Sequence, residues 1–261
     1  MSTAGLLALE AGVVLALMTA LWAPSVALRD SSIVDIFWGS GFVVIAWVGF
    51  ALGEGSHDRS LLLAALVTVW GLRLSIHLAV RNLGKGEDPR YTRMRRRHGD
   101  RWPLRSLFVV FWLQGALMWV VSLPVQVAMS DPTPAGLGAL DYAGAALWLV
   151  GFAFESIGDR QLARFKADPA NRGEVMDRGL WRYTRHPNYF GDFCVWWGIW
   201  LVALASGGAW WTVVGPVVMS LLLIRVSGAA LLERSLSDSR PGYADYVART
   251  SGFIPMPPRR R

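Results

Sequence analysis

Long apolar runs alternate with short charged connectors along the whole chain, and this alternation limits the possible folds more than any other feature. A helix needs about 20 predominantly apolar residues to cross a bilayer. Seven stretches meet this requirement: residues 6–28, 33–52, 61–80, 104–129, 137–157, 189–205 and 209–232. No internal repeat or long linker separates them. The sequence therefore predicts an all-α, multi-pass membrane protein of about seven transmembrane helices that forms one domain, residues 1–261.

Basic residues fall in every second connector. Lysines and arginines crowd the connectors after the third and fifth stretches and the C-terminal tail, whereas residues 130–136 and 206–208 contain neither. Cytosolic loops of membrane proteins carry the excess of Lys and Arg. We therefore predict an N-terminus outside the cell and a C-terminus in the cytosol. The same rule accounts for the net charge of +7, so that charge does not indicate a nucleic-acid partner.

Ionisable side chains within the predicted spans are the first candidates for a functional site. Asp35 begins the second span, and Arg73, His77 and Arg81 share one face of the third at spacings of i, i+4 and i+8. The other positions are Glu155 and Asp159 in the fifth span, Asn188 and Asp192 in the sixth, and Glu233 at the end of the seventh. In the predicted topology all lie toward the cytosolic ends of their helices, which predicts a shared polar cavity open to the cytosol.

An interfacial position is the alternative for each of these residues, because charged side chains near helix ends extend to the membrane surface. We favour that interpretation for Arg81, Arg182 and Arg225. Short acidic side chains reach the surface poorly, and polar groups from several helices at one depth are typical of a binding site. We therefore favour a functional role for Asp35, His77, Glu155 and Asp192.

The basic connectors also indicate what the cavity holds. Guanidinium groups bind phosphate through paired hydrogen bonds, so a soluble, phosphate-bearing cofactor suits them. No Gly-x-Gly-x-x-Gly motif follows a strand, which argues against a Rossmann domain. The single cysteine, Cys194, and four histidines on different elements predict no metal centre.

Residues 179–192, GLWRYTRHPNYFGD, are the densest polar segment and resemble a known family. The run RHPNYFGD at 185–192, preceded by GLW, is similar to the C-terminal signature of the steroid 5α-reductases, and above all to bacterial members of the former DUF1295 group. Further similar segments are DIFWG at 35–39, WGLRL at 70–74, EDPRY at 87–91 and FKADP at 165–169. Sterol reductases carry a related segment. Isoprenylcysteine carboxyl methyltransferases share a shorter form and bind S-adenosylmethionine, but Asn188 and Asp192 favour the reductases.

The resemblance implies a membrane-embedded oxidoreductase of steroid or other lipid metabolism, in the inner membrane of a bacterium. Such an enzyme uses NADPH to reduce the C=C bond of an enone, with hydride added at the β-carbon. Negative charge then develops on the carbonyl oxygen, which the protein must hydrogen-bond or protonate. The expected partners are a lipid-soluble enone entering from the bilayer and the membrane lipids themselves, and the chain is expected to be a monomer.

Residue roles follow from the same resemblance. It implies cofactor contacts for Arg81, Asn82, Glu155, Asp159, Lys166, Arg172, Tyr183, Arg185, Asn188, Tyr189, Asp192, Glu233 and Tyr246, with Tyr243 as a further candidate in the tail. The steroid reductases grip the substrate carbonyl with a glutamate on the second span and a tyrosine on the third. Asp35 takes the place of the glutamate, and the third span here has no tyrosine. Trp70 and His77 are the nearest substitutes.

Two alternatives remain beside an NADPH-dependent enone reductase. One is a lipid or isoprenylcysteine methyltransferase that uses S-adenosylmethionine, and the identity of the bound cofactor distinguishes it. The other is a transporter, whose site would usually lie at the bilayer midplane beside broken helices. The polar residues here gather toward one side instead, which argues against transport.

Overall fold

The computed structural model describes residues 1–226 and 242–259, and these are helical apart from turns, connectors and one isolated bridge between Thr184 and Ser251. The chain divides into two compact units. The first comprises Met1–Asp141 and Val202–Gly215, and the second comprises Tyr142–Leu201 and Pro216–Arg261. Each unit is described by itself.

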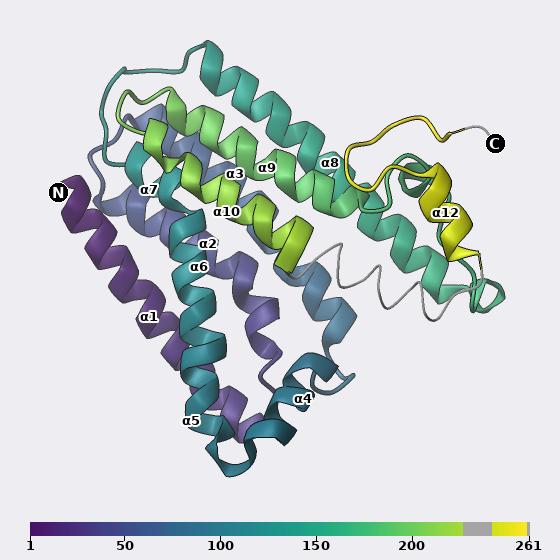
Figure 1. The fold of residues 1–261 in the computed structure, drawn as a ribbon. Coiled ribbons are helices and arrows are strands. Elements are labelled where there is room, and N and C mark those ends of the chain that lie inside the picture. Colours follow the sequence, from purple (N-terminus) through teal and green to yellow (C-terminus); the bar gives the residue numbers. More distant parts are fainter. Residues whose placement is uncertain (227–241, 260–261) are drawn as a thin grey trace. The chain divides into compact units, whose positions relative to one another are not determined.

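Seven α-helices carry most of the first unit (Figure 1). They are α1 (Thr3–Leu28), α2 (Ile33–Leu52), α3 (His57–Asn82), α4 (Pro89–His98), α5 (Trp102–Ser106), α6 (Leu113–Val121) and α7 (Leu123–Ala128). A 3-10 turn (Gly99–Arg101) links α4 to α5, and a π-helical stretch (Leu107–Trp112) links α5 to α6. Helix α2 packs against both α1 and α3, while α4 and α5 form one end of the unit.

Two glycines let α2 and α3 approach closely. A Cβ atom on Gly71 would lie 2.5 Å from the carbonyl oxygen of Gly39, and a Cβ on Gly39 would clash with the carbonyl oxygen of Gly71. Next to this contact, Ser75 Oγ accepts a hydrogen bond from the Ser40 backbone N–H at 3.0 Å. Small residues allow membrane helices to pack this tightly. The antiparallel pair therefore brings the start of α2, with Asp35, to the same end as the close of α3.

A buried ion pair fixes the opposite end of α3. Arg59 donates through Nε and Nη2 to the two carboxylate oxygens of Asp141, at 2.9 and 3.2 Å. Its Nη atoms also donate to the carbonyl oxygens of Pro134 and Gly136. Both charged side chains are almost completely buried, 1% and 0% exposed. The arginine thus ties residues 134–141 to the first turn of α3.

The second unit is built around α8 (Ala139–Ala167) and α9 (Pro187–Leu204), with α10 (Val214–Leu221) and α12 (Tyr243–Arg249). Helices α8 and α9 also meet at glycines. A Cβ on Gly151 would lie 2.5 Å from the carbonyl oxygen of Gly191, and a Cβ on Gly198 would lie 2.6 Å from that of Gly144. These glycines recur at seven-residue spacing along both helices, so the two backbones stay close over several turns.

The C-terminal segment of the second unit folds back onto the connector between α8 and α9 (Figure 1). Thr184 donates from Oγ1 to the carbonyl of Phe253 at 2.8 Å, and Arg185 N–H donates to that of Ser251 at 2.9 Å. Tyr246 donates its hydroxyl to the carbonyl of Trp181 at 2.6 Å. Burial raises the pKa of Tyr246, so the hydroxyl stays protonated and keeps this bond at neutral pH.

The helices of the structure confirm the prediction of an all-α membrane protein. Five helical stretches are long and apolar enough to cross a membrane: Thr3–Leu28, Ile33–Leu52, His57–Asn82, Pro89–Val121 and Ala139–Ala167. They indicate an integral, multi-pass protein. The predicted sixth span coincides with α9, an 18-residue apolar helix, and the seventh is described only as far as Val226. The count of seven and the orientation stay predictions.

Candidate functional site

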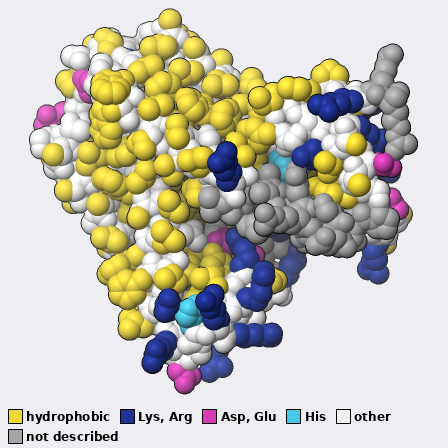
Figure 2. All heavy atoms as spheres, in the orientation of Figure 1, with side chains coloured by type: hydrophobic (Ala, Val, Ile, Leu, Met, Phe, Trp, Pro, Cys, Tyr) yellow, Lys and Arg dark blue, Asp and Glu magenta, His cyan; other side chains and the backbone are white. Residues whose placement is uncertain are grey.

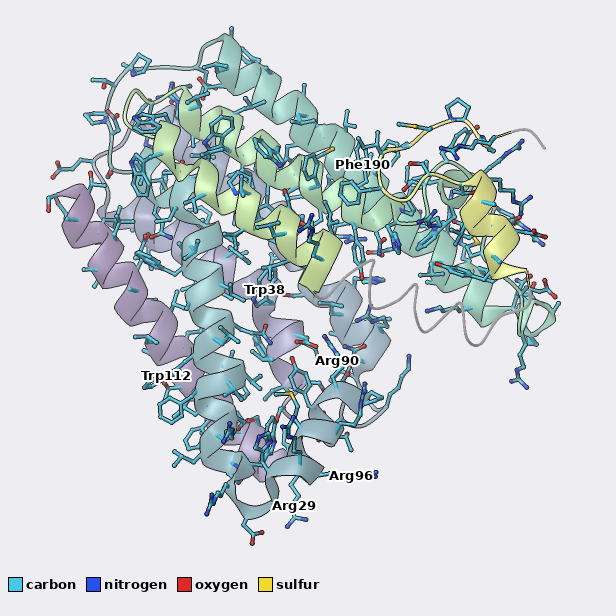
Figure 3. All side chains as sticks on the ribbon, viewed as in Figure 1. Arg29, Trp38, Arg90, Arg96, Trp112 and Phe190 are labelled. Carbon is cyan, nitrogen blue, oxygen red and sulfur yellow. The ribbon has the colours of Figure 1, made fainter. Side chains whose placement is uncertain are left out.

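Asp35 is the centre of a hydrogen-bonded cluster at one end of the first unit. Its carboxylate accepts the Tyr91 hydroxyl at 2.8 Å and the Gln114 amide at 3.4 Å, while Gln114 also donates to the Tyr91 hydroxyl oxygen at 3.0 Å. Arg90 forms an ion pair with the other carboxylate oxygen at 2.9 Å. The side chain of Asp35 is only 18% exposed. We call Asp35, Tyr91 and Gln114 the Asp35 cluster; Figure 3 labels Arg90 beside it.

The sequence explains why Tyr91 reaches Asp35. Asp88 caps α4 by accepting the Arg90 backbone N–H at 2.8 Å, and Pro89 occupies the first helical turn, where proline is favoured. Glu87, just before the cap, accepts the Ser31 backbone N–H at 2.9 Å and pairs with Arg95 at 2.7 Å. The EDPRY segment therefore starts α4 and fastens it to the beginning of α2.

The ionised carboxylates of Glu87 and Asp88 stabilise the attachment of α4 to the beginning of α2. Burial alone would raise the pKa of Glu87, but the hydrogen bonds from Arg95 and Ser31 outweigh it and hold the pKa below its usual value. Burial alone would also raise the pKa of Asp88, but the hydrogen bonds from Arg90 outweigh it and lower the pKa. Both carboxylates are thus ionised at neutral pH, as their bonds to N–H donors require.

Tyr91 and Gln114 are the residues that the sequence analysis did not find. The resemblance implies a tyrosine on the third span, whereas the hydroxyl that reaches Asp35 comes from α4. A signal was present, because Tyr91 ends the EDPRY segment that carried part of the family resemblance. Gln114, one polar residue in the apolar fourth stretch, gave a weaker signal.

The other predicted residues of the first unit lie along α3. Trp70 is fully buried, and its ring meets that of Phe42 edge-on at 5.5 Å. His77 lies two turns further along α3 and is half-buried. Arg81 and Asn82 are the last two residues of the helix, and Arg81 Nε donates to Asn82 Oδ1 at 3.0 Å. Their assignment to substrate or cofactor stays a prediction.

Predicted cofactor residues gather on the facing surfaces of α8 and α9. Asn188 donates from Nδ2 to the Asp159 carboxylate at 3.0 Å, joining the two helices. Glu155 lies one turn before Asp159 and Asp192 one turn after Asn188, and all three acids are buried. Gly191 makes this possible, since a Cβ there would clash with the backbone of Glu155 and lie 2.5 Å from the carbonyl of Gly151.

A small cavity lies beyond this polar group in the second unit, between the end of α8, the following connector and α12. Its volume is about 150 Å³. Lys166, Arg185, His186 and Tyr246 are among the polar side chains that line it, beside apolar ones such as Trp181. Arg185 also donates from Nη1 to the Val247 and Thr250 carbonyls, at 3.2 and 2.8 Å. The cavity walls therefore include three of the residues predicted to bind a cofactor.

The remaining predicted cofactor residues are dispersed in the second unit. Arg172 is exposed in the connector after α8, and Tyr183 is 43% exposed after a 3-10 turn. Tyr189, in the first turn of α9, stacks on His186 with ring centroids 5.5 Å apart. Glu233 lies outside the described residues.

The polar side chains of the second unit that were predicted to bind a cofactor are of two chemical kinds. Buried acceptors from Glu155, Asp159 and Asp192 suit the hydroxyl and amide donors of a ribose and nicotinamide. Cationic side chains at Lys166 and Arg172 suit phosphate.

Comparison with known proteins shows the family of this chain. Residues 21–250 match the model of the family described as "Protein of unknown function (DUF1295)", so the chain belongs to that family. It is 26% identical to a protein of Schizosaccharomyces pombe described as "Uncharacterized protein C594.04c", over 90% of this chain and 75% of the relative. No solved structure matches the chain.

Proposed function

We propose that this member of the DUF1295 family is an NADPH-dependent reductase of the C=C bond of a lipid-soluble enone, in the manner of a steroid 5α-reductase. The single observation that carries the proposal is the Asp35 cluster, in which a tyrosine hydroxyl is fixed against a carboxylate. This is the acid–tyrosine pairing that the resemblance to the steroid reductases implies for the substrate carbonyl, here supplied from α2 and α4.

The cluster suits the charge that develops in enone reduction. NADPH, when bound, supplies the hydride. The Tyr91 hydroxyl, which donates to Asp35 in the structure, turns to the carbonyl oxygen of the enone and gives it its proton as the negative charge forms. Gln114 donates to the Tyr91 oxygen at 3.0 Å and stabilises the tyrosinate that remains. The Asp35 carboxylate, 2.8 Å from that oxygen, takes a proton from water and passes it to the tyrosinate. Arg90, 2.9 Å from Asp35, keeps the carboxylate in place.

The second unit supplies the proposed cofactor residues. Asn188 and Asp159 hold the polar surface of α8 and α9 together and offer acceptors to the nicotinamide and ribose. Lys166 and Arg172 provide the cations for the phosphates. Arg185 and Tyr246 line the small cavity of this unit. Tyr183, Tyr189, Arg81, Asn82 and Glu233 are included in the proposal on the family resemblance.

The remaining features of the proposal concern the membrane. We propose seven spans with the N-terminus outside and the C-terminus in the cytosol, in a bacterial inner membrane. A steroid-like substrate then enters from the bilayer and needs no aqueous route. The proposed protein is a monomer of one domain.

Cofactor binding gives the direct test. Purified protein is titrated with NADPH and, separately, with S-adenosylmethionine, and membranes are incubated with NADPH and a Δ4-3-oxosteroid before the products are analysed by mass. We expect NADPH binding and a product with two additional hydrogens.

Asn188→Ala should weaken NADPH binding, whereas Asn171→Ala, in the connector outside the polar surface, serves as the matched control. Binding of S-adenosylmethionine in place of NADPH would show a methyltransferase instead.

A further inference from the structure

Helix α4 separates its arginines into two groups. Arg90 and Arg95 pair with Asp35 and Glu87 of the first unit. Arg93, Arg96 and Arg97, at spacings of i, i+3 and i+4, are exposed. None of these three forms an ion pair with any of the described residues. Two arginines of the helix are thus paired within the fold, while three are left for a partner.

Arginines of neighbouring segments extend the exposed group. Arg29 ends α1, and Arg101 and Arg105 lie in and after the turn that follows α4; all three are exposed. Figure 2 shows basic side chains gathered at this end of the first unit, and Figure 3 labels Arg29 and Arg96 there. We call Arg29, Arg93, Arg96, Arg97, Arg101 and Arg105 the α4 basic surface.

The fold holds this surface in place without a ligand. Trp22 of α1 donates from its indole N–H to the Pro103 carbonyl at 2.8 Å, and Trp102 donates to Ser31 Oγ at 3.3 Å. Glu87 adds the ion pair with Arg95 that fastens α4. The arginines therefore project from a fixed base, which lowers the entropy cost of binding.

Exposed apolar side chains border the α4 basic surface. Leu28 at the end of α1 is 68% exposed, Leu104 of α5 is 63% exposed, and Phe108 one turn later is 48% exposed. In a multi-pass protein such side chains meet lipid tails, so the arginines beside them lie at the depth of the headgroups. Guanidinium groups bind phosphate there through paired hydrogen bonds.

We propose that the α4 basic surface binds the headgroups of anionic phospholipids. A juxtamembrane cluster of four to eight basic residues is the usual form of such a site, with about 1 kcal/mol for each Lys or Arg, that is, about fivefold in affinity. The topology rule explains why arginines occur in this connector, but it does not explain why three neighbouring exposed arginines of α4 lack an acidic partner among the described residues. The site is separate from the Asp35 cluster, because none of its six arginines belongs to that cluster.

Lipid selectivity tests the proposal. The protein is reconstituted in phosphatidylcholine bilayers, and the association of spin-labelled phosphatidylglycerol is compared with that of spin-labelled phosphatidylcholine. At low salt the wild type should prefer phosphatidylglycerol. The double variant Arg93→Gln, Arg97→Gln should lose about fivefold of that preference for each arginine removed. The matched control Arg160→Gln, Arg164→Gln removes the same charge at the same i, i+4 spacing from exposed positions of α8 and should keep the preference.

Three outcomes would overturn the proposal. They are no preference in the wild type, an equal loss in both double variants, and displacement of phosphatidylglycerol by inorganic phosphate, which would show a site for a soluble anion. Should the double variant fail to fold, the proposal is tested by the salt dependence of the wild-type preference for phosphatidylglycerol. The preference must fall as salt shortens the Debye length from about 30 Å at 0.01 M to about 8 Å at 0.15 M.

Discussion

At the residue scale, one hydroxyl group determines what Asp35 can do. The Tyr91 hydroxyl lies 2.8 Å from the carboxylate and is itself held by Gln114. A carboxylate alone accepts hydrogen bonds, whereas the tyrosine hydroxyl adds a proton that passes to a carbonyl oxygen once the hydroxyl turns from Asp35. The proposed chemistry thus depends on a contact between α2 and α4.

Tyr91→Phe removes that hydroxyl and little else. We expect NADPH-dependent enone turnover to fall about a hundredfold, within the range lost when a general acid is removed. NADPH affinity should stay unchanged, since Tyr91 lies outside the proposed cofactor residues. Tyr142→Phe, at a 65% exposed position, is the matched control and should keep full turnover. Normal turnover by Tyr91→Phe would remove the Asp35 cluster from the mechanism.

At the residue scale, the ion pairs of Arg59 and Arg249 differ in how deeply they are buried. Arg59 pairs with Asp141 in a fully buried site, whereas Arg249 pairs with Asp177 where the two side chains are 47% and 35% exposed. Removing one partner of a buried pair costs about 3–5 kcal/mol of unfolding free energy, because the other charge is left buried. An exposed pair contributes about 0–1 kcal/mol.

Arg59→Gln should therefore destabilise the protein much more than Arg249→Gln. The measurement is the unfolding free energy in a detergent that allows reversible denaturation. Replacing both partners, Arg59→Met with Asp141→Leu, should recover part of the loss, since no unpaired charge then remains. Equal destabilisation by the two single glutamine variants would contradict the assigned burial of the Arg59 pair.

At the element scale, glycine contacts set the distance between helices. The close approach of α8 and α9 at Gly151 and Gly191 is what allows the 3.0 Å hydrogen bond between Asn188 and Asp159. A methyl group at Gly191 has no space, because it would meet the backbone of Glu155. The proposed cofactor surface therefore depends on a residue with no side chain.

Gly191→Ala should force α8 and α9 apart. We expect a loss of about 1–3 kcal/mol in unfolding free energy, as for other overpacked sites, together with weaker NADPH binding. The control is Gly12→Ala in α1, where an added Cβ meets no atom within 4 Å. That change should be neutral or slightly stabilising, because alanine favours a helix. If Gly191→Ala destabilises the protein but leaves NADPH affinity unchanged, the contact between α8 and α9 does not support cofactor binding.

The attachment of α4 depends on pH through Glu87. Its folded pKa is depressed, so its stabilising effect is complete above the ordinary value of 4.5 and is lost as the pH falls through the lower folded value. The unfolding free energy of the wild type should consequently decrease below about pH 4.5 more steeply than that of Glu87→Gln, because glutamine has no carboxylate to protonate. At neutral pH the variant should be the less stable of the two. Parallel stability curves, measured by thermal unfolding from pH 3 to 7, would contradict this role.

At the scale of the whole molecule, the orientation in the membrane is open to a direct measurement. Cys194 is the single native cysteine and is buried. A cysteine introduced at Ala135 or at Lys85, both exposed, then reports the side on which its connector lies. We expect a membrane-impermeant maleimide to label Ala135→Cys from outside intact cells and Lys85→Cys only after the membrane is opened. The reverse pattern would invert the predicted topology.

Much of the fold could be predicted from the sequence. The first three spans and the fifth agree with long helices, because length and hydropathy act locally along the chain. The sequence predicts only a basic connector where α4 lies, whereas the Asp88 cap and Pro89 start a short helix there. The glycine contacts between α8 and α9 were not recognised, because one sequence does not reveal which face of a helix meets another.

The sequence by itself determined that this chain is a helical membrane protein and that Asp35, Asp159 and Asn188 are polar residues in otherwise apolar helices. Only the tertiary structure decided which groups these side chains meet. Asp35 is bound by a tyrosine 56 positions later, and Asp159 by an asparagine 29 positions later. The physical reason is that hydropathy and charge are summed over neighbouring residues, whereas a hydrogen bond between distant residues depends on how closely two backbones pack.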